Sequence, residues 1–150
     1  MKPEDKELLL QDLCARLPYQ PFCKKIDAED DFCEYDDLLG YSLRDLVNNK
    51  IIIKPYLRPL STMTEEEARD IAILHGYNTF EILSTKVADE YIDIILDNCD
   101  HSTITSTIWY DGIISSLECF DYLNKKMFDY RGLIPKDLAL SIETFNPYKD

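Results

Sequence analysis

Residues 51–57 read Ile51-Ile52-Ile53-Lys54-Pro55-Tyr56-Leu57 and carry the strongest β-strand signal in the chain. β-branched and aromatic side chains of this kind favour an extended, half-buried backbone. Pro55 has no N–H to donate, so this strand is expected at a sheet edge or to end in a bulge. The preceding Asn48-Asn49 is typical of a turn, which makes Leu43–Val47 the expected hairpin partner. A second strand is expected at Phe22–Ile26.

A helix is expected before these strands, over about residues 3–16. Leu9, Leu13 and Leu17 recur there at helical spacing, and Pro18 ends the pattern. Cys14 lies beside this apolar stripe and is expected to be a small core residue.

The chain after Leu60 is expected to be mainly helical. Thr64 and Glu67 have the spacing of a capping box, and the helix they begin is expected to end near His75-Gly76. Three more elements are predicted from the spacing of apolar residues: helices at Val87–Leu96 and Leu117–Met127, and a short strand at Thr103–Trp109.

These elements predict an α+β fold, in which the N-terminal helix packs on a small antiparallel sheet and a mainly helical C-terminal half follows. We expect a single domain over residues 1–150, with 1–60 as a candidate α/β sub-domain and 61–150 as a candidate helical sub-domain.

The composition is that of a folded, acidic protein. The chain has 150 residues, 45% of them hydrophobic, and its 29 acidic and 16 basic residues give a net charge of −13. So negative a charge argues against direct binding to nucleic-acid phosphates, which attract basic surfaces. Residues 1–75 carry a balance of −6 and residues 76–150 one of −7, so the charge belongs to the surface rather than to a tail.

The N-terminus and the cysteines predict a cytoplasmic protein. The first residues show no signal-peptide pattern, and no apolar run approaches the roughly 20 residues of a membrane span. Five widely spaced cysteines without a C-x-x-C pair are typical of a reduced chain that has neither a zinc knuckle nor a thioredoxin-like motif.

The most acidic stretch is residues 27–37, with seven acids in eleven residues and no base. Such a run is typical of a solvated loop. The alternative is an acidic face that docks a basic partner or mimics nucleic-acid phosphates. Its contact residues would be Asp30, Asp31, Asp36 and Asp37.

Catalytic signatures are scarce. Asp97-Asn98-Cys99-Asp100-His101 is the densest group of possible ligands, with Asp97, Cys99 and His101 as the metal candidates. Its spacing matches no H-E-x-x-H, C-x-x-C or EF-hand pattern, and a helix-end turn is the alternative. No glycine-rich phosphate loop or G-x-S-x-G elbow is present, so no catalytic residue and no cofactor is predicted.

Two pairs of residues are further candidates for contact with a partner. Tyr56 and Arg58 lie on the predicted edge strand, where a partner could add a strand; the alternative is that Arg58 and its neighbouring proline only protect that edge. Tyr130 and Arg131 are residue types that often anchor interfaces, and the alternative is an internal pair between Asp129 and Arg131 that locks a turn.

Three stretches resemble a known family: Leu8–Tyr19, Ile53–Glu67 and Phe128–Leu140, about 40 residues in all. The chain is similar there to a family of small uncharacterised proteins of gut anaerobes and of their phages and mobile elements. The resemblance implies a cytoplasmic, often mobile-element-encoded protein, and a small or partial barrel packed on the N-terminal helix. It implies no catalytic residues.

We therefore expect a small, acidic, non-catalytic interaction or accessory protein that binds a protein partner with a basic surface. One alternative is a small enzyme or metal-dependent regulator that uses the Asp97–His101 cluster, and another is a virion or structural component. Neither direct nucleic-acid binding nor membrane association is expected, and the oligomeric state is left open.

Overall fold

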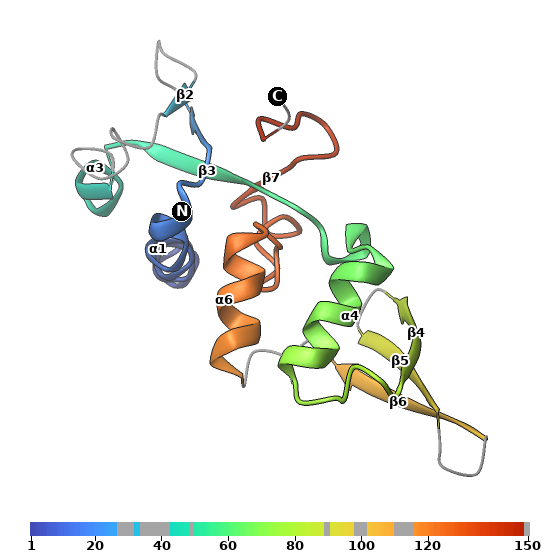
Figure 1. Ribbon diagram of the computed structural model, residues 1–150. Coiled ribbons are helices and arrows are strands. Elements are labelled where there is room, and N and C mark those ends of the chain that lie inside the picture. The colour runs from blue at the N-terminus through green and yellow to red at the C-terminus, as the bar shows by residue number, and fades with distance from the viewer. Residues whose placement is uncertain are drawn as a thin grey trace. The chain divides into compact units, whose positions relative to one another are not determined.

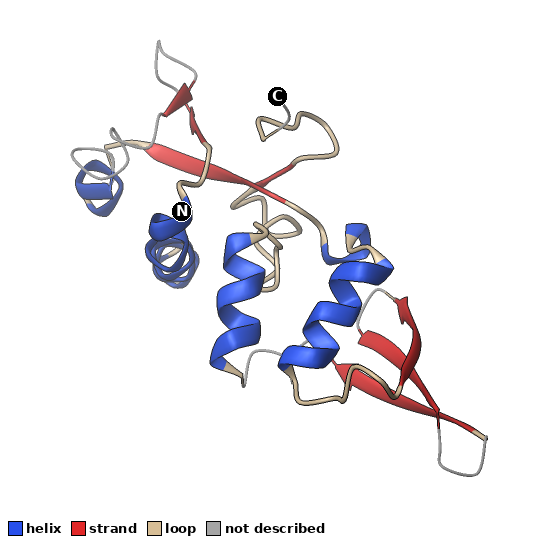
Figure 2. Cartoon of the chain, in the orientation of Figure 1, coloured by secondary structure: helices blue, strands red, loops and turns tan. Residues whose placement is uncertain are grey.

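The computed structural model describes residues 1–26, 32–33 (backbone only), 43–48, 50–88, 91–97, 102–109 and 116–148. The chain divides into two compact units. Unit 1 comprises Met1–Pro59 together with Asn124–Asp150, and unit 2 comprises Leu60–Leu123. Helices and strands occur in both units, which confirms the predicted α+β class (Figure 2).

The predicted N-terminal helix of unit 1 is confirmed. Helix α1 spans Pro3–Arg16, and a 3-10 turn, η1, follows at Leu17–Tyr19 (Figure 1). Pro3 suits the first helical turn, where its missing N–H is not needed, and the acidic side chains of Glu4 and Asp5 favour the positive end of the helix dipole.

The buried face of α1 differs from the predicted one. It is formed by Leu9, Asp12, Leu13 and Arg16, whereas Cys14 is exposed. The prediction that Cys14 belongs to the core is therefore wrong. Cys14 follows Leu13 by one residue and so lies about 100° further round the helix, outside a stripe that has the regular three- and four-residue spacing of a buried face.

A four-stranded sheet in the order β2-β1-β3-β7 completes unit 1. Its strands are β1 at Cys23–Ile26, β2 at Phe32–Cys33, β3 at Ile52–Leu57 and β7 at Leu140–Ser141. The two predicted strands are thus confirmed as β1 and β3. Strand β1 pairs antiparallel with β2 and β3, while β7 pairs parallel with β3. The described strands of this sheet do not close into a ring, because its end strands β2 and β7 do not pair with each other.

The expectation that β3 is an edge strand is wrong, because β3 lies between β1 and β7. The N–H of Tyr56 donates to Phe22 O on the β1 side (2.9 Å), so the nitrogen of Pro55 faces the other side. Pairing with β7 starts only at Tyr56, opposite Leu140. An interior strand therefore tolerates Pro55 because the strand on that side begins one residue later.

The predicted hairpin partner of β3 is a helix instead. Residues Leu43–Val47 form α3, and the N–H of Asn48 donates to Arg44 O (3.0 Å) to close its last turn. Leu43 and Leu46, three residues apart, both pack in the core, a spacing that suits a helix and would place them on opposite faces of a strand. The period of the apolar residues thus decided the local structure.

Two hydrophobic clusters form the core of unit 1. The first joins α1, β1, α3 and β3 through Leu9, Leu13, Cys23, Leu46 and Ile53. The second joins β3 to the C-terminal segment through Leu57, Met127, Leu133, Leu138 and Ala139. The predicted packing of the N-terminal helix on a small sheet is thus seen in the first cluster.

Unit 2 contains helix α4 and a three-stranded antiparallel sheet in the order β4-β5-β6. Helix α4 spans Glu65–Leu74 and begins with the predicted capping box: the hydroxyl of Thr64 accepts from Glu67 N (3.2 Å), and the Glu67 carboxylate accepts from Thr64 N (3.0 Å). A 3-10 turn, η3 at Leu60–Thr62, precedes it, and the helix ends at Leu74 with His75 as its C-cap, close to the predicted end.

The predicted helix over Val87–Leu96 is wrong. Its residues lie at the end of β4 (Ile82–Val87) and in β5 (Tyr91–Asp97), and β6 occupies Thr103–Trp109 as predicted. The C-terminal half is therefore mostly strands. Along β5 the buried residues Ile92 and Ile94 alternate with more exposed neighbours, which is the period of a half-buried strand. The β-branched side chains of this segment favour the same conformation.

The last helix, α6, spans Leu117–Lys125, slightly shorter than predicted. The hydroxyl of Ser116 accepts from Cys119 N (3.4 Å) at its start. Within unit 2, the Tyr122 hydroxyl donates to Asp70 Oδ2 on α4 (2.9 Å). None of the helices in the described ranges has the length and apolar character that a membrane span needs.

Candidate functional site

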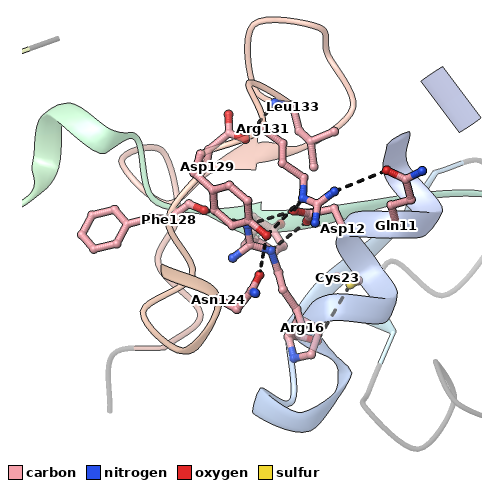
Figure 3. Close-up of polar contacts among 12 residues, drawn as sticks. Gln11, Asp12, Arg16, Cys23, Asn124, Phe128, Asp129, Arg131 and Leu133 are labelled. Atoms are coloured by element: carbon pink, nitrogen blue, oxygen red, sulfur yellow. Dashed lines mark hydrogen bonds and ion pairs between the residues drawn. The ribbon is translucent and has the colours of Figure 1, made fainter. Parts of the chain in front are cut away.

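Unit 1 contains a buried polar network centred on Asp12 and Arg16 of α1 (Figure 3). Both side chains are fully buried. Arg16 Nε donates to Asp12 Oδ2 (2.7 Å) and Arg16 Nη2 donates to Asp12 Oδ1 (2.9 Å). The same Nη2 donates to the carbonyl of Phe128 (2.7 Å), which is 112 residues away in sequence. The pair therefore ties α1 to the segment that follows α6.

A second set of polar groups surrounds this ion pair. Arg131 Nε lies 3.5 Å from Asp12 Oδ1 and also donates to the Tyr130 hydroxyl (3.1 Å). The Tyr130 hydroxyl donates to Asn124 Oδ1 (2.9 Å), and the Arg16 guanidinium lies over the Tyr130 ring at 5.2 Å. Burial raises the pKa of Tyr130 above its ordinary value. Asp12 thus receives two guanidinium groups, one fully buried and one partly exposed.

Asp129 stabilises the turn formed by the residues that follow it, up to Ile134. Its two carboxylate oxygens accept from Leu133 N (2.7 Å) and Ile134 N (2.8 Å). Burial raises the pKa of Asp129, although these two hydrogen bonds act in the opposite direction. The turn contains Gly132 at φ +67°, a backbone conformation that favours glycine. The predicted turn is therefore present, but the backbone, and not Arg131, is the direct partner of Asp129.

The geometry of the network is that of a structural clamp. Its carboxylates are buried, and its carboxylates and guanidinium groups bind one another, the backbone or neighbouring polar side chains. The one exception is Arg16 Nη1, which is buried without a hydrogen-bond partner among the described residues. Because a buried charge is costly unless it is paired, such a network stabilises one particular packing of its segments. We assign to it the joining of the two sequence segments of unit 1.

Tyr56 and Arg58, which the sequence suggested as partner contacts, both take part in the packing of unit 1. Tyr56 is only 5% exposed, in the interior of the sheet. The Arg58 guanidinium lies over the Phe128 ring at 4.2 Å, and its backbone exchanges hydrogen bonds with Met127 and Asp129. Tyr130 and Arg131 belong to the clamp described above. The structure therefore brings Arg58, Tyr130 and Arg131 together around the clamp. Tyr56 instead packs against Phe145 at a ring distance of 5.6 Å.

Other predicted site residues lie outside the described residues: Asp30, Asp31, Asp36, Asp37, Cys99 and His101. Asp97 is described and lies exposed at the end of β5, opposite Thr103 of β6. In the described ranges no three His, Cys, Asp or Glu side chains come together as a metal site would require.

The distribution of charge between the units was not visible in the sequence. Unit 2, residues 60–123, has 13 acidic and 2 basic residues, a net charge of −11. Unit 1 has the remaining 16 acidic and 14 basic residues, a net charge of −2. Dividing the chain at its midpoint hid this asymmetry, because the C-terminal segment of unit 1 was counted with unit 2. Most of the net charge therefore belongs to the 64 residues of unit 2.

The sheet of unit 2 has one covered and one open face. Helix α4 packs on the face that carries Ile92, Ile94 and Ile108, all buried, and no described element of this unit lies on the other face (Figure 2). On that open face Trp109, 52% exposed, pairs edge-to-face with Tyr91 at a ring distance of 5.1 Å.

The open face continues in polar residues along β5 and β6. Thr103, Thr105 and Thr107 are exposed in β6, and the Thr107 hydroxyl donates to Asp93 Oδ1 (2.7 Å). Lys86 of β4 lies opposite Asp93 in the ladder. An exposed surface of hydroxyls with an aromatic pair at one end is suited to contact with another macromolecule.

One further concave feature lies on unit 1. A shallow groove of about 450 Å³ runs along the exposed side of α1. The described residues that line it are Pro3, Lys6, Glu7, Leu10, Gln11 and Cys14. Its lining combines one acid, one base and one thiol from a single helix, without the convergent polar groups that orient a substrate.

No protein-family model, curated protein or solved structure matches this chain. The acidic unit 2 with its open sheet is the candidate functional site.

Proposed function

We propose that this chain is a non-catalytic interaction protein, and that its unit 2 binds a protein partner with a basic surface. The observation that carries the proposal is the concentration of charge in unit 2, −11 of the total −13. Charges of one sign on a compact unit attract a partner of the opposite sign and speed its association, an effect that salt screens.

Exposed acidic side chains and exposed apolar side chains both support an interface on unit 2. Among the described residues of unit 2, the exposed acids are Glu65, Glu66, Asp70, Glu81, Asp97, Glu118 and Asp121. Large apolar side chains are exposed in the same unit, among them Phe80 (94%), Leu83 (52%), Ile104 (49%), Trp109 (52%) and Leu117 (77%). Apolar side chains surrounded by charge are what an interface needs, because the apolar groups contribute affinity and the charges select the partner.

The other functions considered from the sequence are less well supported. No observation among the described residues favours an enzyme or a metal-dependent regulator centred on Asp97. A virion or structural role requires self-association, which a unit of charge −11 opposes. The resemblance to proteins of phages and mobile elements makes a partner from such an element or its host the natural one to seek, and the neighbouring genes would identify it.

Binding to a basic peptide tests the proposal. Two variants each remove two exposed negative charges: Glu66→Gln with Asp97→Asn in unit 2, and Glu4→Gln with Glu7→Gln in unit 1. We expect a poly-L-lysine peptide to bind the full chain at low salt, and the unit 2 variant to bind it more weakly. Equal weakening by the two variants would mean that only the total charge matters, and would contradict an interface on unit 2.

Salt provides the second arm of this test. Between about 0.01 M and 1 M salt the Debye length falls from about 30 Å to about 3 Å, so binding of the peptide should be lost over this range. A poly-L-glutamate peptide of equal length is the control and should not bind at any salt concentration. Binding of both peptides, or of neither, would overturn the proposed function.

A further inference from the structure

The two edges of the sheet in unit 2 differ in how they are protected. Strand β4 has a register shift between Ile82 and Ser84 and carries Lys86, and both bulges and edge lysines oppose pairing with another strand. Strand β6 has neither. It pairs with β5 in unbroken register over seven residues, from Thr103 to Trp109, and contains no charged residue and no proline. In the described part of unit 2, no strand pairs with its outer edge.

An unprotected edge of this kind is a template for pairing with an extended segment. Its composition is also that of a good strand, since five of its seven residues are β-branched and one is aromatic with β propensity. Natural proteins normally blunt such an edge, so an edge left regular and uncharged indicates that something pairs with it.

The charge of unit 2 decides between the possible occupants. A second copy of the chain would bring together two units of net charge −11 each, which repel one another. An extended segment rich in Lys or Arg would instead be attracted. Charge complementarity therefore selects a basic segment of another protein.

We propose that β6 accepts an extended, basic segment of a partner protein as a fourth strand, on its edge opposite β5. The proposal deepens the proposed function and rests on it, because the same acidic unit recruits the partner. It adds the mode of recognition: main-chain hydrogen bonds along β6 give the affinity, and alternate side chains give the specificity.

The two faces of β6 define the side chains that the added strand should carry. On the face covered by α4 the new strand would lie beside Ile104, which is half exposed and calls for an apolar neighbour. On the open face it would lie beside Thr103, Thr105 and Thr107. Asp93 and Asp97 of β5 share this open face. They lie two strand spacings, or about 9.6 Å, from the added strand. A long basic side chain of that strand can reach them across the short threonines of β6.

The partner segment should therefore alternate apolar and basic residues. A peptide of alternating valine and lysine is the probe for the test. A second peptide of the same sequence carries N-methyl groups on two consecutive central residues, which blocks both edges of its backbone and leaves its charge unchanged. A third peptide has glutamate in place of lysine.

Trp109 reports the binding, because it is the only tryptophan of the chain, lies in β6 and is half exposed. We expect the valine-lysine peptide to shift the fluorescence of the full-length chain to shorter wavelength. The N-methylated peptide should bind about tenfold more weakly or worse, since it loses main-chain hydrogen bonds. The glutamate peptide should not bind.

Two variants locate the binding edge. Thr105 of β6 and Ser84 of β4 both lie opposite Ile95 in the ladder, are both exposed, and so occupy equivalent places at the two edges of the sheet. Each is replaced by lysine, which changes the net charge equally. Thr105→Lys should weaken binding of the valine-lysine peptide several-fold more than Ser84→Lys, because it places a like charge beside the added strand.

The outcomes separate this proposal from the proposed function. Equal binding of the two lysine peptides, or equal effects of the two variants, would overturn strand addition at β6 and leave an acidic docking unit. Failure of both lysine peptides to bind would overturn both proposals. Sedimentation could instead show a dimer of the free chain, in which the fluorescence of Trp109 is at shorter wavelength before any peptide is added and returns to longer wavelength on dilution. This result would show that a second copy occupies the edge, and it would overturn the choice of a basic partner.

Discussion

Asp12 and Arg16 lie one turn apart on α1 and form a two-pronged ion pair that is completely closed off from solvent. A pair at this spacing usually lies on the outer face of a helix and contributes little to stability. Here the helix turns it inward, and the guanidinium continues to the carbonyl of Phe128. The pair therefore connects two segments that are far apart in sequence, and its removal should affect all of unit 1.

Replacing Arg16 alone should be strongly destabilising. Arg16→Met leaves the carboxylate of Asp12 buried with only the more distant Arg131, and we expect a loss of about 3–5 kcal/mol in the free energy of unfolding. Urea unfolding followed by circular dichroism measures it, with Lys125→Met at an exposed position as the control. The double variant Asp12→Leu with Arg16→Met should lose less than the sum of the two single changes, because no unpaired charge remains. Strict additivity would show that the two side chains do not interact.

Asp129 should make the stability depend on pH in an unusual direction. Burial raises the pKa of its carboxyl above the ordinary value of 3.8, so the folded state binds the proton more tightly than the unfolded state. Its contribution to stability is complete below pH 3.8 and is lost as the pH rises through the raised pKa. Asp129→Asn removes this titration. The stability of the native chain minus that of the variant should therefore fall with rising pH from about pH 4 upward, and a rising difference would contradict the assignment.

Tyr148 should ionise at a higher pH than an ordinary tyrosine, because its pKa is raised. Its hydroxyl donates to Tyr56 O (3.0 Å) and accepts from Phe22 N (3.1 Å), and burial raises its pKa well above 10. In an absorbance titration of tyrosinate, Tyr148→Phe should remove a component that ionises above pH 10 and leave the component near pH 10 unchanged. Loss of amplitude near pH 10 itself would show that Tyr148 is accessible in solution.

The capping box of α4 should contribute measurably to unit 2. Thr64→Ala removes the acceptor for Glu67 N, and we expect a loss of about 1 kcal/mol. The fluorescence of Trp109 follows thermal unfolding of this unit, and Ser61→Ala, at an exposed position just before the helix, is the matched control. If both variants melt together with the native chain, the cap is not needed for the helix to form.

Local signals in the sequence predicted the parts of the fold that depend on neighbouring residues. The helix over residues 3–16 follows from its apolar spacing and from Pro18, and β3 follows from its β-branched run. The capping box at Thr64 was readable for the same reason. Each of these features is complete within about 15 residues, so no distant contact was needed to specify it.

The errors arose where distant residues decide the structure. In Val87–Leu96 apolar residues are so dense that they fit a helical face as well as the two faces of a strand, and only pairing of β5 with β4 and β6 settles the choice. The clamp was missed because Asp12 and Arg16 look like a solvated pair until Phe128 is placed beside them. The acidic unit was missed because the charge was compared between the two halves of the sequence, whereas unit 2 spans Leu60–Leu123.

The assembly of unit 1 from both ends of the chain has a consequence for the order of events during synthesis. The described strands of unit 2 pair with their sequence neighbours, so this part can fold while the chain is still being made. Arg16, emerging early, must wait for the carbonyl of Phe128, and β3 must wait for β7, which includes Leu140. A nascent chain therefore exposes the edge of β6 before its own N-terminal helix has found its final partners, so whatever pairs with that edge could do so on the ribosome.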